Sequence, residues 1–235
     1  MDTLKGKQIM VWTFMGNARM YEALRDYGDR ISQIGLFSFK VRATGEIYES
    51  GVAISDTDAY DRLYIQDAYS RIYPIKAMRA WVTDCPNFLS GRMIPLTFRF
   101  HSAMMGSLGI GCNILKFTPE EVELSQKMIR QYKEIRPVIQ EGTFYRLDNP
   151  SADQYFLYEY LKGDKGVLFA FLPQSKVGHR GTTVRLRGLE EEARYILHTS
   201  QGDITKTGSY LMGHGLPLRL SGDYASALVQ FEKIP

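Results

Sequence analysis

The chain has 235 residues, of which 44% are hydrophobic and 23% are charged, and its net charge is +3. These values are typical of a globular protein, and the Lys and Arg residues form no cluster that could follow a nucleic-acid backbone. The two cysteines, Cys85 and Cys112, are too few for a disulfide-rich secreted scaffold.

The first apolar run of the chain covers residues 8–15. It is far shorter than the roughly 18 residues that a membrane helix needs, and no small-residue cleavage site of a signal peptide follows it. We therefore expect no membrane partner and a cytoplasmic location.

Residues 1–54 are predicted to form a strand, a helix and a second strand. The apolar run 8–14 and the run 34–41 are strand candidates, and residues 18–27 have apolar side chains at helical spacing before Gly28. A turn is expected at residues 43–46. This order favours a βαβ unit with a parallel pair of strands.

Strands and helices continue to alternate over residues 51–136. A strand is expected to end at residue 55, and the later strands are expected at 78–82 and 108–114. The expected helices cover 58–70, 96–105 and a longer segment that starts at Thr118. Thr118 and Glu121 have the spacing of a capping box, with Pro119 between them. Gly109 and Gly111 would permit close approach of a neighbouring group.

From residue 142 to the end, short apolar runs are separated by turns that contain glycine, asparagine or aspartate. This spacing favours an antiparallel β-sandwich. The strands are expected at 143–147, 154–161, 167–172, 182–186, 194–198 and 225–231. The predicted fold is therefore α/β plus all-β, with a partial (β/α) barrel over residues 1–136 and a C-terminal antiparallel sandwich over residues 142–235.

Several short motifs occur in a fixed order in the second part of the chain. They are Ser-Asp-Thr-Asp-Ala-Tyr-Asp-Arg at 55–62, Tyr-Pro at 73–74, Trp-Val-Thr-Asp-Cys-Pro-Asn at 81–87, Gly-Arg at 91–92, and the run at 134–146. This order resembles the C-terminal part of the α-galactosidases of glycoside hydrolase family 36. The resemblance covers residues 55–235, about three quarters of the chain, and those enzymes end in a barrel followed by a β domain.

The resemblance implies that Asp56 matches the acid/base carboxylate of a retaining hydrolase of terminal α-galactosides. A retaining glycosidase also needs a nucleophilic carboxylate about 5–5.5 Å away. The family's nucleophile lies in a Lys-Trp-Asp run, which is absent from this sequence, as is the Cys-Ser-x-Gly-Gly-Gly-Arg run of the galactose pocket. Trp81 stands where many relatives have His. We therefore expect little activity from this chain alone.

The residues around Asp56 also have simpler interpretations. Asp56–Asp58 could simply start the helix that follows, since Ser55, Thr57 and Asp58 are all good caps. Asp58 is expected as a cap and Asp61 on the solvated face of the helix. Asp84, beside Cys85-Pro86-Asn87, is a candidate substrate-binding residue, although the same residues could form a turn. The aromatic run at 155–160 could stack on a sugar, but a buried core is the more usual role of such a run.

The opening segment, residues 1–54, resembles the start of the chitinase-like barrels of glycoside hydrolase family 18. That family's Asp-x-x-Asp-x-Asp-x-Glu run does not occur here. The segment therefore has a different origin from residues 55–136, and a join near residues 53–56 is expected. A rearranged gene or an error of sequence assembly would both produce such a join.

Three functions remain open at this point. The chain could be an α-galactosidase-like fragment, a non-catalytic module for carbohydrate binding or assembly, or a chitinase-like hydrolase. No spacing of His, Cys or carboxylates indicates a metal, and no cofactor is expected. The expected partners are an α-galactoside or another carbohydrate and, through open sheet edges, further copies of the chain.

Overall fold

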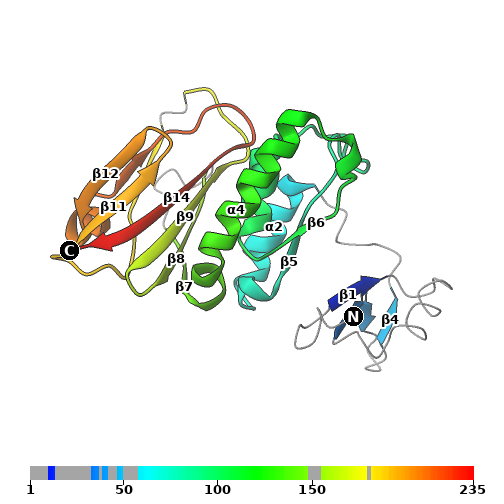
Figure 1. Cartoon of the computed structure of the whole chain (residues 1–235), viewed down its shortest axis with the longest axis horizontal. Helices are drawn as coiled ribbons and strands as arrows, with labels where there is room; N and C mark the ends of the chain where they lie inside the picture. Colours follow the sequence, from blue (N-terminus) through cyan, green and yellow to red (C-terminus); the bar gives the residue numbers. More distant parts are fainter. Residues whose placement is uncertain are drawn as a thin grey trace, which may run out of the picture. The chain divides into compact units, whose positions relative to one another are not determined.

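The computed structural model describes residues 58–147, 155–178 and 181–235, together with the backbone of four short strands between residues 10 and 49. The chain divides into two compact units, residues 1–56 and residues 57–235. Figure 1 shows the course of the chain through these units, which are described one at a time.

The first unit contains two small sheets. Strands β1 (Met10–Thr13) and β2 (Gln33–Leu36) are parallel, and Met10 pairs with Gln33. This confirms the expected parallel pair. Strands β3 (Phe39–Val41) and β4 (Ile47–Glu49) are antiparallel, so the run at 34–41 is divided between two sheets. The helix expected at 18–27 and the turn at 43–46 lie outside the described residues.

The second unit begins with alternating helices and strands. Its elements are helix α2 (Ala59–Tyr69), 3-10 helix η3 (Ile75–Ala77), strand β5 (Arg79–Val82), helix α3 (Leu96–Met104), strand β6 (Ser107–Ile110), 3-10 helix η4 (Ile114–Lys116) and helix α4 (Pro119–Glu141). Strands β5 and β6 are parallel, with α3 as their crossover. This β-α-β unit confirms the strand–helix alternation read from the sequence.

Helix α4 extends further than expected. The capping box at its start is present, since Thr118 accepts from the Glu121 N–H and the Glu121 carboxylate accepts from the Thr118 N–H. The predicted barrel region ends at residue 136, but the helix continues through Pro137 and ends at Glu141. A proline removes one backbone donor from a helix, and this helix still closes with the Gly142 N–H bonded to the Val138 carbonyl at 2.9 Å.

The rest of the unit is mainly a six-stranded antiparallel sheet with the strand order β12-β11-β14-β9-β8-β7. These strands are β7 (Thr143–Arg146), β8 (Phe156–Lys162), β9 (Lys165–Leu172), β11 (Arg194–Thr199), β12 (Gly202–Thr207) and β14 (Ala225–Ile234). A second, two-stranded sheet pairs β10 (Thr182–Val184) with β13 (Leu216–Leu218). A short helix, α5 (Gly208–Gly213), follows β12.

Strand β12 is missing from the sequence expectations, as are α5 and β13. Strand β12 is an exposed edge strand of mostly polar residues, so it lacks the apolar run by which a strand is usually recognised. Helix α5 and strand β13 are short, with six and three residues.

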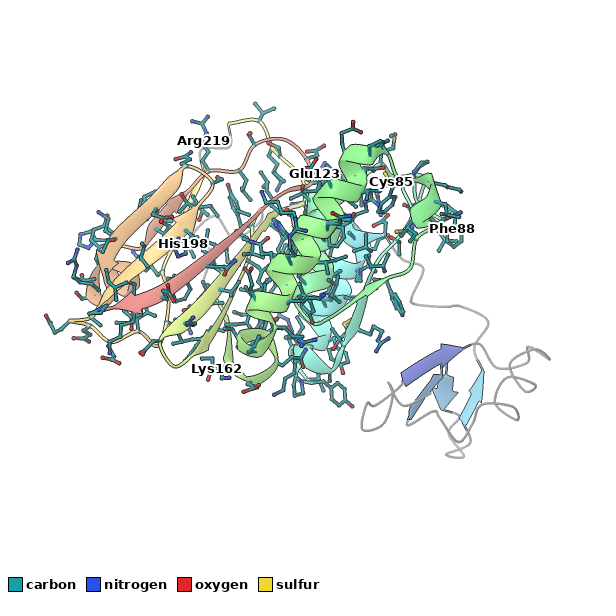
Figure 2. All side chains as sticks on the ribbon, in the orientation of Figure 1. Cys85, Phe88, Glu123, Lys162, His198 and Arg219 are labelled. Carbon is teal, nitrogen blue, oxygen red and sulfur yellow. The ribbon has the colours of Figure 1, made fainter. Side chains whose placement is uncertain are left out.

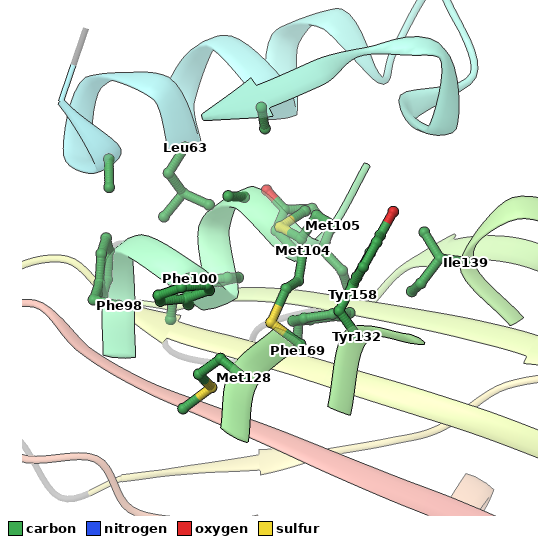
Figure 3. Close-up of a cluster of buried hydrophobic side chains, with 14 of the residues drawn as sticks. Leu63, Phe98, Phe100, Met104, Met105, Met128, Tyr132, Ile139, Tyr158 and Phe169 are labelled. Carbon is green, nitrogen blue, oxygen red and sulfur yellow. The ribbon is translucent and has the colours of Figure 1, made fainter. Parts of the chain in front are cut away.

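The large sheet separates two hydrophobic cores. Helices α2, α3 and α4 lie between this sheet and the β5–β6 pair (Figure 1). Figure 3 shows the core between the helices and the sheet, which contains Phe98, Met104, Tyr132 and Phe169. The opposite face carries a second core with residues of β10, β13 and α5, among them Leu211 and Leu216. Within the described ranges, no helix is long and apolar enough to cross a bilayer.

The aromatic run at 155–160 lies at the start of strand β8. Tyr155, Tyr158 and Tyr160 are all at most 6% exposed, which confirms their core role. The Tyr160 hydroxyl donates to the Met105 carbonyl and joins the sheet to the end of α3. Phe156 is only partly buried.

Candidate functional site

The loop that follows β5 is held against the N-terminus of helix α2. Asp58 is the N-cap of α2, and its Oδ1 accepts a hydrogen bond of 3.0 Å from the Asp61 N–H. The other carboxylate oxygen accepts from the Ser90 hydroxyl and from Arg92 Nη1, the latter at 2.7 Å. Asp58 is therefore a helix cap, as expected from the sequence. It also joins the start of α2 to the loop after β5, about thirty residues away.

Arg92 bridges two carboxylates. Its Nη1 lies 2.7 Å from Asp58 Oδ2 and 2.7 Å from Asp61 Oδ2, and its guanidinium lies 4.7 Å from the centre of the Tyr60 ring. Burial raises the pKa of Asp58, but the bonds from Ser90, the Asp61 N–H and Arg92 outweigh it, so that the pKa lies below its usual value. Asp58 therefore stays ionised at neutral pH.

Asn87 shapes the same loop from inside. Its side-chain oxygen accepts from the Leu89 N–H at 3.0 Å and the Ser90 N–H at 3.1 Å, and its carbonyl accepts from the Gly91 N–H at 2.8 Å. Gly91 has a φ of +69°, which disfavours any residue with a side chain. The Pro-Asn and Gly-Arg motifs therefore form one compact loop. Ser90 and Arg92 hold this loop to Asp58, and neither residue had been given a role from the sequence.

Asp84 lies in this loop and is half-buried. Its Oδ1 accepts from the Asn113 N–H at 3.1 Å, which ties the loop after β5 to the segment after β6. Figure 2 shows its neighbour Cys85, with Phe88 further along the same loop. The substrate-binding role of Asp84 stays a prediction. Asp56 lies outside the described residues, two positions before Asp58.

Arg62 places a second cation beside Asp58. It is 3% exposed, and within the part of the chain that the structure describes its three side-chain nitrogens have no hydrogen-bond partner. Burial lowers the pKa of Arg62 to about 10, and the charge of Asp58 partly offsets this effect. The start of α2 is therefore a region of opposed, closely placed charges.

The described ranges contain no group of three His, Cys or carboxylate side chains placed to hold a metal ion. What they present at this site is a loop held by hydrogen bonds, several carboxylates and two guanidinium groups near the ends of two parallel strands. Active sites of barrel enzymes usually lie at the C-terminal ends of the parallel strands. This geometry is suited to an acid–base site, but it does not identify a substrate.

Comparison with known families identifies the architecture. The Melibiase family model matches residues 46–142, and the model of the glycosyl hydrolase family 36 C-terminal domain matches residues 157–231. Over these residues the chain belongs to glycoside hydrolase family 36. This confirms the family 36 resemblance, and the match starts at residue 46, upstream of the expected residue 55. The likeness of residues 1–54 to family 18 stays a prediction.

Curated relatives support the same family. Alpha-galactosidase C of Emericella nidulans is 36% identical over 180 residues, which cover 76% of this chain and 24% of that protein. Alpha-galactosidase AgaA of Geobacillus stearothermophilus is 32% identical over 183 residues, covering 76% of this chain and 25% of that protein. The chain thus spans about a quarter of the length of the relatives that it matches.

Solved structures agree with the sequence matches. The family 36 α-galactosidase AgaB of Geobacillus stearothermophilus superposes with a TM-score of 0.70 at 31% identity, over 76% of this chain and 25% of that one. A variant of AgaA from the same organism, in complex with raffinose, gives a TM-score of 0.70 at 30% identity with the same coverage. The likeness to family 36 α-galactosidases thus covers about three quarters of this chain in both sequence and fold.

Proposed function

We propose that residues 55–235 form the C-terminal part of an α-galactosidase that hydrolyses terminal α-galactosides with retention of configuration. In this proposal β5, α3, β6 and α4 are the last part of a barrel, and the large sheet with β10 and β13 is the C-terminal sandwich. The bound partner is an α-galactoside, as the raffinose and stachyose complexes of AgaA variants suggest.

The observation that carries this proposal is the clamp between the loop after β5 and the start of α2. Asp58 is held by Ser90 and Arg92, so the chain two residues beyond Asp56 is fixed in place. An acid/base group must be held in reach of the glycosidic oxygen, and a fixed backbone serves that purpose. Asp56 is therefore proposed as the acid/base and Asp84 as a substrate contact.

We further propose that this chain has little activity on its own. The Lys-Trp-Asp run that carries the family's nucleophile does not occur in the 235 residues. Without a nucleophile the covalent step of a retaining mechanism is lost, and removal of one member of a cooperating pair costs most of the rate. A non-catalytic carbohydrate-binding or assembly module is the alternative, and the surface of α2 provides an observation in its favour.

Hydrolysis of an aryl α-galactoside by the purified chain tests this function, with an aryl α-glucoside as the control substrate. We expect turnover close to the uncatalysed rate, and no difference between the wild type and Asp56→Ala. Rapid hydrolysis that Asp56→Ala abolishes would show that a nucleophile is present in the chain. Glu46 and Asp84 would then be the next residues to replace.

A further inference from the structure

Four aromatic side chains from three separate segments meet on the outer surface of helix α2. Tyr60 and Tyr64 lie about one turn apart on α2, and their ring centres are 5.2 Å apart. Phe156, at the start of β8, lies 4.9 Å from Tyr64, and Tyr224, just before β14, lies 5.9 Å from Tyr60. We call these four residues the aromatic platform.

The aromatic platform lies at the border of the buried core. Tyr60, Phe156 and Tyr224 are partly buried and pack against that core, whereas Tyr64 is 46% exposed. The rings of Phe156 and Tyr64 meet edge to face, at an interplanar angle of 82°. Tyr64 is therefore the member that the platform exposes most to solvent.

Tyr224 reaches the platform with a strained backbone. Its φ is +54°, and it is the one described residue other than glycine with a positive φ. A bulky residue in this region is strained and persists where the surrounding structure requires it. The ring contacts of Tyr224 with Tyr60 and with Phe98, 6.0 Å away, are the surroundings that hold it there.

The charged groups around the platform leave it slightly negative. Arg92 covers one side of the Tyr60 ring, and its single positive charge faces the two carboxylates of Asp58 and Asp61. Burial, and then a hydrogen bond with Tyr60, raises the pKa of Tyr64 to about 12, so its hydroxyl remains protonated at neutral pH. A surface with one more carboxylate than cation offers little attraction to phosphate or nucleic acid. Its aromatic rings and phenol hydroxyls instead suit a polyol that has an apolar face.

From this arrangement we propose that the aromatic platform is a saccharide-binding surface outside the substrate site. The apolar face of a sugar ring would stack on Tyr64, the exposed member, and its hydroxyls would bond the phenol oxygens and the Asp61 carboxylate. The proposal takes its ligand class, galactose-containing oligosaccharides, from the proposed function. It also gives the carbohydrate-binding alternative a location on the molecule.

Calorimetric titration of the full chain with stachyose tests the platform. We expect saturable binding whose Kd rises at least fivefold in Tyr64→Ala and changes less than twofold in Tyr64→Phe, which keeps the ring. Tyr73→Ala is the matched control. Like Tyr64, Tyr73 is an exposed tyrosine, with 58% of its surface accessible. It lies just beyond the end of α2 and contacts Tyr69, so its replacement should leave the Kd unchanged. Circular dichroism verifies that each variant is folded.

Several results would overturn the platform. They are the absence of stachyose binding, an unchanged Kd in Tyr64→Ala, an equal loss in Tyr73→Ala, and displacement of stachyose by a proline-rich peptide that binds more tightly. Binding that Asp84→Ala abolishes and Tyr64→Ala preserves would place the sugar in the proposed substrate site alone. That pattern overturns the platform and leaves the proposed function intact, so the two failures are distinguishable.

Discussion

The indole ring of Trp81 lies directly against Gly109 of the neighbouring parallel strand. The two residues are paired in the register of β5 and β6, and a β-carbon at position 109 would stand 2.5 Å from Cε3 of the indole. At Gly111 the corresponding distance to the same atom is 3.3 Å. The two glycines therefore make room for a large aromatic ring, as the sequence analysis expected of a close approach at these positions.

Gly109→Ala should destabilise the protein because the new methyl group overlaps the Trp81 ring. Overpacking of this kind typically costs about 1–3 kcal/mol. Chemical denaturation monitored by circular dichroism measures the change, and the smaller ring of Trp81→His should relieve part of it in the double variant. Gly213→Ala is the control, since a β-carbon there meets no atom within 4 Å and no loss of stability is expected.

Arg92→Met should destabilise the protein by about 1–3 kcal/mol because it removes the cation that hydrogen-bonds the buried Asp58 carboxylate. The Arg92 and Asp58 side chains are 34% and 3% exposed, whereas those of Arg71 and Asp67 are 65% and 16% exposed. Arg71→Met should therefore cost much less. Equal unfolding midpoints for the two variants in urea would contradict the importance of the clamp.

Glu159 should make the protein less stable as the pH rises. Burial raises the pKa of this fully buried carboxyl to about 8, against the opposing effect of the Arg187 N–H and charge. Between about pH 4.5 and 8 the folded state then binds more protons than the unfolded state, so the free energy of unfolding falls with increasing pH. The total loss is on the order of 2–4 kcal/mol.

Glu159→Gln tests this dependence because glutamine keeps the acceptor for the Arg187 N–H without a titrating proton. The variant should have a flatter profile of unfolding free energy between pH 5 and pH 9, measured in urea. An unchanged profile in the variant would show that other groups cause the pH dependence.

The sequence predicted those parts of the fold that have strong periodicity or clear capping signals. Helix α2 begins after the expected cap, Asp58, and helix α4 begins with the expected capping box of Thr118 and Glu121. Strand β12 escaped prediction because an exposed edge strand needs no apolar face. The end of α4 was misplaced because Pro137 indicates a break that the helix in fact tolerates.

The site followed the same pattern. The motifs around Asp56 and Asp84 were recognisable from their spacing, but spacing does not reveal which side chains meet. The contact of Arg92 with Asp58 joins residues that are 34 positions apart. The aromatic platform depends on three segments that are brought together only by the packing of α2 against β8 and the segment before β14.

Hydrogen exchange should show that the second unit is the more stable one. Strand β9 lies inside the six-stranded sheet and is almost entirely buried, whereas β1 and β2 form a sheet of only two strands. Small sheets with unpaired edges open more readily. The amides of residues 167–172 should therefore exchange more slowly than those of residues 34–41, and the reverse order would contradict the prediction.

Covalent trapping of the glycosyl–enzyme intermediate tests the central claim most directly, namely that this chain carries the family's acid/base without its nucleophile. An activated fluoro-galactoside forms a long-lived ester with the nucleophile of a retaining enzyme, and intact-mass spectrometry detects the adduct. We expect no adduct on the purified chain under conditions that label a full-length family 36 α-galactosidase completely. An adduct of one sugar per chain, located on a carboxylate of this sequence, would contradict the account.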